Sequence, residues 1–128
     1  MMTREGDFLV VDPLNVGLVQ AVAYFRSSVD DGDRRAILMQ QDCVRRWAAV
    51  NGVEIIREFC DVGPERAASE NRPAFAEMLN HWITRRNDFE RVLCFDWSRL
   101  GRGGEDGEAS LAVVCRQHGK RIVVTAAH

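Results

Sequence analysis

The chain has 128 residues, of which 46% are hydrophobic and 28% charged, so it has room for one globular domain and its composition excludes wholesale disorder. No apolar run approaches the roughly 18–20 residues of a membrane span, and the first twenty residues lack the basic start of a secretory signal. The net charge of −2 is unlike that of a protein that binds nucleic acid by bulk electrostatics.

The first half of the chain alternates between apolar and polar stretches. Residues 1–17 combine a polar start with scattered turn-forming residues, and we expect them to form a flexible tail. The pattern that follows predicts a buried strand over 18–26, a polar loop over 30–35, a helix over 36–51 and a second strand over 53–59. Asn51 and Gly52 are a typical helix stop, because glycine readily takes the left-handed conformation that ends many helices.

The second half repeats this alternation. Residues 61–71 lack clear periodicity and are expected to be irregular. Pro73 suits the first turn of a helix, and the apolar residues after it share one helical face that we expect to lie in the core: Phe75, Met78, Leu79, Trp82 and Ile83. The sequence then predicts a strand over 92–95, a glycine-rich loop, a helix over about 106–118 and a strand over 121–125.

Strands that alternate with helices and are apolar on both faces indicate an α/β fold, with a mostly parallel central sheet and helices on both faces. Residues 18–128 are expected to form this domain. In such folds, ligands bind at the carboxyl ends of the strands. Hydroxyl, carboxylate and arginine side chains lie at or after the ends of three predicted strands: Tyr24, Arg26, Ser27, Ser28, Asp61, Arg66, Arg72, Asp96, Ser98, Arg99 and Arg102.

Arginines around a serine suit nucleophilic attack on a phosphodiester, because guanidinium groups stabilise the charge that builds on the phosphoryl oxygens without requiring a metal. In an extended strand, Arg26 and Ser28 share a face that Ser27 does not. Arg72 precedes Pro73 at a helix N-terminus, where free N–H groups also favour an anion. No single residue is specific, and Asp61 alone is more typical of a turn or a helix-capping acceptor than of a catalytic group.

Other kinds of site are not visible in the sequence. There is no P-loop and no Gly-x-Ser-x-Gly elbow, and Gly101 and Gly103 lack the further glycine of a dinucleotide fingerprint. The three histidines and the four cysteines have no metal-ligand spacing, so neither a metal nor another cofactor is expected. The cysteines occur singly in or beside apolar runs, which suits small core residues of a cytoplasmic protein.

Four motifs follow one another along the chain: Tyr24-Phe25-Arg26-Ser27-Ser28, then Gln40 seven residues before Trp47-Ala48, then Asp61 ahead of Arg72-Pro73, and last Ser98-Arg99-Leu100-Gly101-Arg102. Each is weak by itself. In this order, over about residues 22–125, they resemble the catalytic domain of serine recombinases, the resolvase and invertase family, with its Tyr-x-Arg-x-Ser signature and its Asp/Ser-Arg-Leu-x-Arg motif.

The resemblance implies a metal-independent recombinase that cleaves and rejoins DNA. By this resemblance Ser28 attacks a phosphodiester and forms a covalent 5′-phosphoserine link, and Gln40 positions the active-site loop. Asp61 would take part in proton transfer or, as we favour, orient an arginine, while Tyr24 would line the site or pack beneath it. The scissile phosphate would be bound by four arginines: Arg26, Arg72, Arg99 and Arg102.

The chain departs from the family pattern in two places. Asp61 lacks the Ser-Gly that usually follows it, and Ser98 stands where many members have aspartate, with Asp96 nearby as a substitute. Family members continue into a long helix and a DNA-binding domain, whereas this sequence ends at His128. We therefore expect weak DNA binding by this chain, and a homodimer or tetramer when it acts on DNA.

Two alternatives remain open from the sequence. The chain could be a non-catalytic module that associates with a full-length recombinase. It could also be a small regulator that binds a phosphate group or a nucleotide, although it lacks a glycine-rich phosphate loop.

Overall fold

The computed structural model describes residues 18–27, 35–63, 72–96, 99 and 108–126. The predicted tail at 1–17 and the glycine-rich loop lie outside these residues. The described elements follow one another in this order: β1 (Val19–Ser27), α1 (Arg35–Val50), β2 (Val53–Val62), α2 (Pro73–Glu77), the π-helix η3 (Met78–Ile83), β3 (Arg91–Cys94), α3 (Glu108–Gln117) and β4 (Arg121–Val124).

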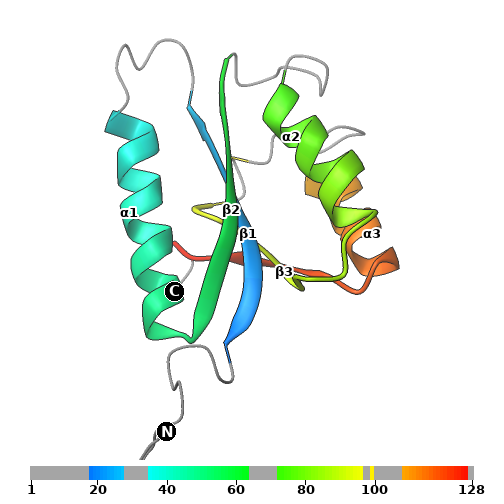
Figure 1. Cartoon of the computed structure of the whole chain (residues 1–128). Helices are drawn as coiled ribbons and strands as arrows, with labels where there is room; N and C mark the ends of the chain where they lie inside the picture. The colour runs from blue at the N-terminus through cyan, green and yellow to red at the C-terminus, as the bar shows by residue number, and fades with distance from the viewer. Residues whose placement is uncertain (1–17, 28–34, 64–71, 97–98, 100–107, 127–128) are drawn as a thin grey trace, which may run out of the picture.

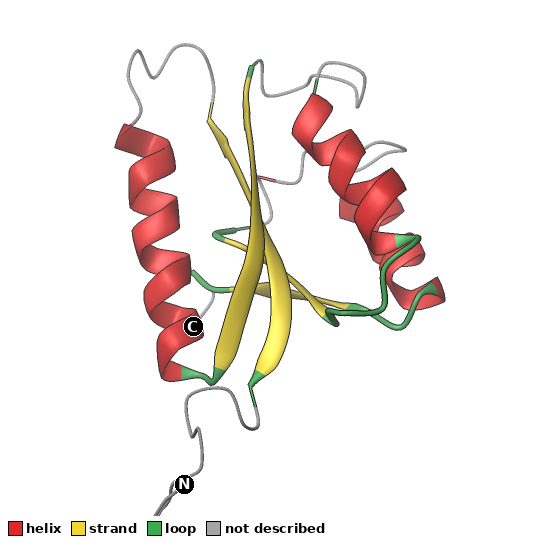
Figure 2. Ribbon diagram, in the orientation of Figure 1, coloured by secondary structure: helices red, strands yellow, loops and turns green. Residues whose placement is uncertain are grey.

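The four strands form one sheet in the order β2-β1-β3-β4, and every neighbouring pair is parallel. Helix α1 covers one face of the sheet, and α2, η3 and α3 cover the other, as Figures 1 and 2 show. The predicted α/β fold, with a parallel sheet between helices, is confirmed. No helix in the described part of the chain is long and apolar enough to span a membrane.

Strand β1 lies inside the sheet and is buried on both faces. Ala21, Ala23 and Phe25 pack in the cluster beneath α1, whereas Val22 and Tyr24 pack in the cluster beneath α2, η3 and α3. This alternation is that of an extended strand, and burial on both sides explains why residues 18–26 read as one apolar run. The fold thereby holds the carboxyl end of β1 between two hydrophobic cores.

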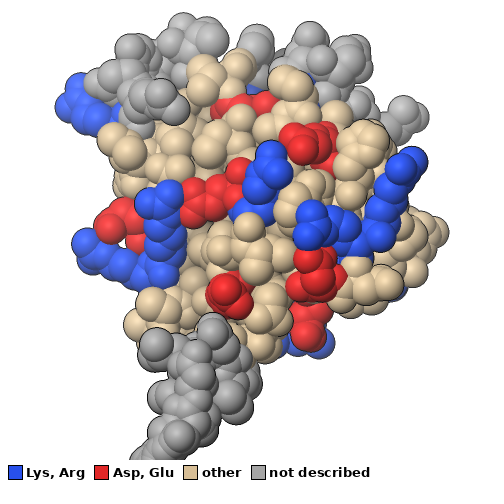
Figure 3. Space-filling view, viewed as in Figure 1, with Lys and Arg blue, Asp and Glu red and all other residues tan. Residues whose placement is uncertain are grey.

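Strand β2 forms one edge of the sheet and carries charged side chains. Arg57 pairs with Glu77 at 3.5 Å, and on the opposite face Arg45 of α1 makes two 2.7 Å hydrogen bonds to Glu58. Basic and acidic side chains are interspersed on the molecular face in Figure 3. Charges along an exposed edge strand discourage pairing with another chain.

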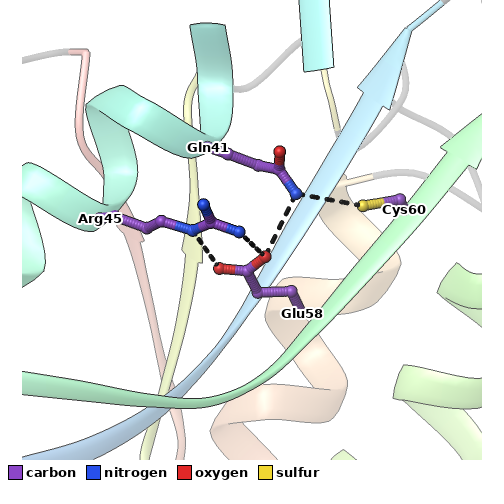
Figure 4. Close-up of polar contacts among 4 residues, drawn as sticks. All are labelled: Gln41, Arg45, Glu58 and Cys60. Carbon is purple, nitrogen blue, oxygen red and sulfur yellow. Dashed lines mark hydrogen bonds and ion pairs between the residues drawn. The ribbon is translucent and has the colours of Figure 1, made fainter. Parts of the chain in front are cut away.

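A β-bulge in β2 sets which side chains face which helix. Ala21 pairs with Ile55 and Val22 with Arg57, so Ile56 is an extra residue opposite β1. Ile55 packs toward α1 and Ile56 toward the other face, but beyond the bulge it is Glu58 that contacts α1. Figure 4 shows Glu58 and Cys60 turned toward Gln41 and Arg45 of α1. Phe59 and Asp61 consequently face α2.

The prediction that the second strand ends at residue 59 was wrong. β2 continues to Val62, so Asp61 lies inside a strand and not in an irregular segment. Arg26 pairs with Asp61 and Ser27 with Val62, and these ladder contacts extend a strand whose polar end resembles a loop in sequence. Cys60 is also exposed, contrary to the expectation of a core residue, whereas Cys94 and Cys115 are buried.

The predicted helices are present with shifted ends. Gly52 and Gly119 have φ values of 70° and 71°, and each follows the end of a helix, as predicted for Gly52. The helix predicted after Pro73 begins as an α-helix and continues as the π-helix η3. Its expected core face is largely confirmed: Phe75, Met78 and Ile83 are buried, while Leu79 and Trp82 are half-buried.

Candidate active site

The carboxyl end of β1 lies at the centre of the candidate site. Tyr24, Arg26 and Ser27 are buried residues of the strand itself, and not of a loop after it. Ser28, the predicted nucleophile, follows the last residue of β1 directly but lies outside the described residues, as do Arg66, Ser98 and Arg102. The described site residues surround this point: Tyr24, Arg26, Gln40, Asp61, Arg72 and Arg99.

Gln40 of α1 binds the backbone of Arg26 at both of its polar groups. Its Nε2 donates to the Arg26 carbonyl oxygen at 2.8 Å, and its Oε1 accepts from the Arg26 N–H at 3.2 Å. Pairing between β1 and β3 stops at Tyr24, so the Gln40 amide takes the place that the next residue of β3 would occupy. Gln40 is 0% exposed, and a buried backbone pair left without these bonds would cost about 1–3 kcal/mol per group.

Arg26 and Arg99 meet at the same end of β1. The Arg26 guanidinium donates through Nη2 to the Gly63 carbonyl oxygen at 3.2 Å. Arg99 donates through Nη1 to the Arg26 carbonyl oxygen at 3.2 Å, and its Nε lies 3.5 Å from Oδ1 of Asp96. Asp96, noted as a substitute for the family aspartate at position 98, thus contacts Arg99. Donors from α1 and from Arg99 therefore converge on a backbone group two residues before Ser28.

Asp61 anchors the beginning of α2. Its Oδ1 accepts from the Ala74 N–H and its Oδ2 from the Phe75 N–H, both at 2.9 Å. An α-helix begins with N–H groups that have no partner within the helix, and a carboxylate there is favoured by hydrogen bonding and by the helix dipole. The anion that we expected at this N-terminus is therefore a side chain of the protein itself. Asp61 therefore makes the contacts of a helix-capping acceptor, which is one of the interpretations that the sequence offered for it.

Tyr24 completes the set of donors to Asp61. Its hydroxyl donates to Oδ2 of Asp61 at 2.8 Å from the neighbouring strand. Burial raises the pKa of Tyr24 far above its ordinary value, and the charge and hydrogen bond of Asp61 raise it further. The positive charges of Arg72 and Arg26 oppose this rise in the pKa, because they favour the phenolate form. The net shift is upward, so Tyr24 is a neutral donor to Asp61.

Arg72 occupies the position just before α2, and its side chain is 2% exposed. Its Cζ lies over the Phe75 ring, 4.1 Å from the ring centroid. Since Asp61 holds the N–H groups of Ala74 and Phe75, the same carboxylate fixes the backbone that carries Arg72. Within the described residues, no group of three or more His, Cys, Asp or Glu side chains could hold a metal ion.

A family model for the N-terminal domain of resolvases matches residues 21–128, well over half of the chain. The chain belongs to the resolvase family. No curated protein matches the sequence of this resolvase domain at a significant level.

Solved structures of serine recombinase catalytic domains share the fold of this resolvase domain. The C-terminal catalytic domain of ISC1926 TnpA, an IS607-like serine recombinase, has a TM-score of 0.70 at 19% identity over 84% of this chain and 67% of that one. For the N-terminal catalytic domain of TP901-1 integrase the TM-score is 0.69 at 21% identity, over 84% and 78%. A serine recombinase from Sulfolobus solfataricus has a TM-score of 0.62 at 24% identity, over 84% and 68%.

Two groups at the candidate site of this resolvase domain, Phe75 and the Gly63 carbonyl, are not among the site residues predicted from the sequence. Phe75 was assigned to the core, yet its ring contacts Arg72 and its N–H binds Asp61. An arginine just before a helix and an aromatic residue three positions later share one side of the first turn, and that spacing could have indicated the contact. The Gly63 carbonyl could not have been found, because it depends on how far β2 runs alongside β1.

Proposed function

We propose that this resolvase domain cleaves and rejoins DNA strands in site-specific recombination, with Ser28 as the nucleophile. Membership of a family whose solved relatives are serine recombinase catalytic domains supports this function. The observation that carries it is the fixation of β1 just before Ser28, where Gln40 and Arg99 bind the Arg26 backbone. Rigid placement of a nucleophile beside arginines is what phosphoryl transfer requires.

In the proposed reaction, Ser28 Oγ forms a bond to the phosphorus of a DNA phosphodiester as the bond from phosphorus to the 3′ oxygen breaks. The serine gives up one proton and the departing 3′ oxygen gains one, which leaves a free 3′-hydroxyl and a 5′-phosphoserine link. The reverse attack by a 3′-hydroxyl of another strand releases the serine. One phosphodiester is consumed and one is formed, so the cycle needs no external energy source or cofactor.

We base the proposed roles of the other residues on the family resemblance and, for the described residues, on their contacts. Arg26, Arg72, Arg99 and Arg102 would bind the scissile phosphate and stabilise the charge that develops on its oxygens. Gln40 would hold the backbone that leads to Ser28. Asp61 is poorly suited to accept the serine proton, because its oxygens already accept three hydrogen bonds. We therefore assign Asp61 and Tyr24 to orienting the arginines.

We also propose that several copies act together on DNA. Each serine can hold one DNA end, so breaking both strands of one duplex takes two copies. Exchanging strands between two duplexes takes four, because four covalent links form. A dimer that pairs into a tetramer on DNA meets this requirement.

Covalent trapping tests the proposed nucleophile. The protein is incubated with nicked duplexes of varied sequence, from which the cleaved strand can diffuse away, and is then denatured and weighed by mass spectrometry. We expect a protein–DNA adduct with the intact chain and its loss in Ser28→Ala. Ser27→Ala is the matched control, because Ser27 is the preceding hydroxyl and is buried as the last residue of β1. It should retain the adduct.

The test is repeated with this chain fused to a sequence-specific DNA-binding module, on duplexes that carry the site of that module. Weak DNA binding then cannot explain a missing adduct. Absence of an adduct from both proteins, or its persistence in Ser28→Ala, would overturn the proposed function.

A further inference from the structure

We propose that Phe75 is a positioning residue that orients Arg72 for the scissile phosphate. The inference rests on the proposed function, and it deepens that function by giving a role to a side chain that otherwise belongs to the core. It concerns one contact, between the phenyl ring of Phe75 and the guanidinium of Arg72.

The Phe75 ring is fixed from several directions. Its backbone N–H donates to Asp61 at 2.9 Å, and the ring meets Tyr24 edge-on, with centroids 5.4 Å apart and planes inclined at 71°. The side chain is 1% exposed and belongs to the core beneath α2, η3 and α3. A ring held in this way is a rigid support, and the Arg72 Cζ lies 4.1 Å from its centroid.

An aromatic support differs in kind from a carboxylate partner. Arg45 illustrates the second case: it donates through both Nε and Nη2 to Glu58 at 2.7 Å, so two of its donors and its charge are engaged. A ring attracts the cation through its face but accepts no conventional hydrogen bond and carries no net charge. Phe75 can thus restrict the movement of Arg72 without competing with a phosphate for its donors or its charge.

A double-mutant cycle on the trapping reaction tests this role. Phe75→Leu removes the ring but keeps an apolar side chain, and Arg72→Gln removes the guanidinium. We expect Phe75→Leu to lower the rate of adduct formation at saturating DNA by about 10-fold or more, with little change in the half-saturating DNA concentration. In the Arg72→Gln background, the same change should alter the rate by less than about 2-fold, because its effect acts through Arg72.

Phe59→Leu is the matched control for lost packing. Phe59 is a buried phenylalanine of the same core, and its ring contacts Arg57 and Trp82. Its loss should lower the melting temperature about as much as Phe75→Leu does and leave the rate at saturating DNA within about 3-fold of the intact protein. Equal rate losses in the two variants, or additive effects of Phe75→Leu and Arg72→Gln, would show a structural role only and overturn the inference.

Inorganic phosphate separates this inference from the proposed function, because its binding needs no catalysis. We expect phosphate to raise the melting temperature of the intact chain, and Phe75→Leu and Arg72→Gln to reduce this rise non-additively. If the intact chain forms no adduct but this phosphate pattern is observed, the covalent mechanism fails and the role of Phe75 stands. If neither an adduct nor an Arg72-dependent phosphate effect is found, both proposals fail.

Discussion

Asp61 accepts hydrogen bonds from Tyr24 and from the N–H groups of Ala74 and Phe75, so one carboxylate connects β1, β2 and the first turn of α2. Helix caps of this kind are each worth roughly 0.5–2 kcal/mol. The bond from a buried phenol adds to that value, because removing Asp61 would also leave the hydroxyl without its acceptor. At the scale of the residue, Asp61 therefore fixes the first turn of α2, and with it the backbone of Arg72 directly before that helix.

Tyr24 offers a spectroscopic test, because it is the only tyrosine in the chain. Burial and Asp61 raise its pKa above its ordinary value of about 10, so the folded protein keeps the phenol proton at a pH where the unfolded chain loses it. This contribution to stability is fully present below pH 10 and is lost as the pH rises beyond it. We expect the ultraviolet signal of phenolate to appear only together with unfolding.

The measurement is an alkaline titration that follows phenolate absorbance and far-ultraviolet circular dichroism in the same samples. The chain in denaturant should ionise near pH 10, and Tyr24→Phe should give no phenolate signal. Ionisation near pH 10 with the circular dichroism unchanged would contradict the buried hydrogen bond to Asp61.

At the scale of the element, the bulge in β2 is what allows Phe59 and Asp61 to face α2. Strict alternation from Ile55, which faces α1, would place both of them on the α1 face. Ile56 and Arg57 instead lie together on the α2 side, Ile56 in the core and Arg57 near the rings of Phe59 and Trp82. The one extra residue of the bulge thus reverses which face of the sheet each later side chain of β2 occupies.

We therefore expect β2 to tolerate the deletion of one residue at the bulge but not the insertion of one. Deleting Arg57 leaves Ile56 to pair with Val22, so the bulge is lost and Phe59 and Asp61 keep their side of the sheet. The deletion also removes a surface ion pair with Glu77 and contacts with two rings. We expect this variant to fold, with a free energy of unfolding lower by roughly 1–3 kcal/mol.

Inserting one alanine between Arg57 and Glu58 should instead turn Phe59 and Asp61 to the wrong face and abolish cooperative unfolding. Urea titration of both variants measures the difference. An insertion as stable as the deletion would contradict the role assigned to the bulge.

At the scale of the whole molecule, the net charge of −2 predicts that DNA affinity does not come from a general basic surface. Acidic and basic side chains are mixed on the face drawn in Figure 3. The arginines of the candidate site would then supply most of the contacts with phosphate. Each phosphate contact on duplex DNA contributes about 0.9 to the slope of log K against log salt concentration. If only these four arginines contact phosphates, the DNA affinity should fall only modestly as the salt concentration rises.

We expect a slope no steeper than about −4 for binding of this chain to a duplex, measured by fluorescence anisotropy over a range of salt concentrations. Arg72→Gln should reduce the slope by about 1 or less and weaken binding to all sequences equally. Arg46→Gln is a suitable control, because Arg46 is exposed on α1 and pairs with Asp42. A slope of about −8 or steeper would reveal a basic surface that the charge distribution does not predict.

The sequence by itself determined the order of strands and helices, the strand that ends in the Tyr24–Arg26 segment and the helix stop at Gly52. These features depend on local spacing, because side-chain alternation, helical periodicity and the conformational freedom of glycine act over a few residues. The order of the motifs was also readable from the sequence, and it resembled the family that the chain belongs to.

Only the tertiary structure decided what these residues touch. Tyr24 and Asp61 are 37 positions apart, and Gln40 lies 14 positions from Arg26, so each bond depends on how the strands align and how α1 packs on them. The extension of β2 through Asp61, the bulge at Ile56 and the contact between Phe75 and Arg72 arise in the same way. A polar residue carries no local sign of its partner, because the partner is fixed by the register of the sheet and the packing of the helices.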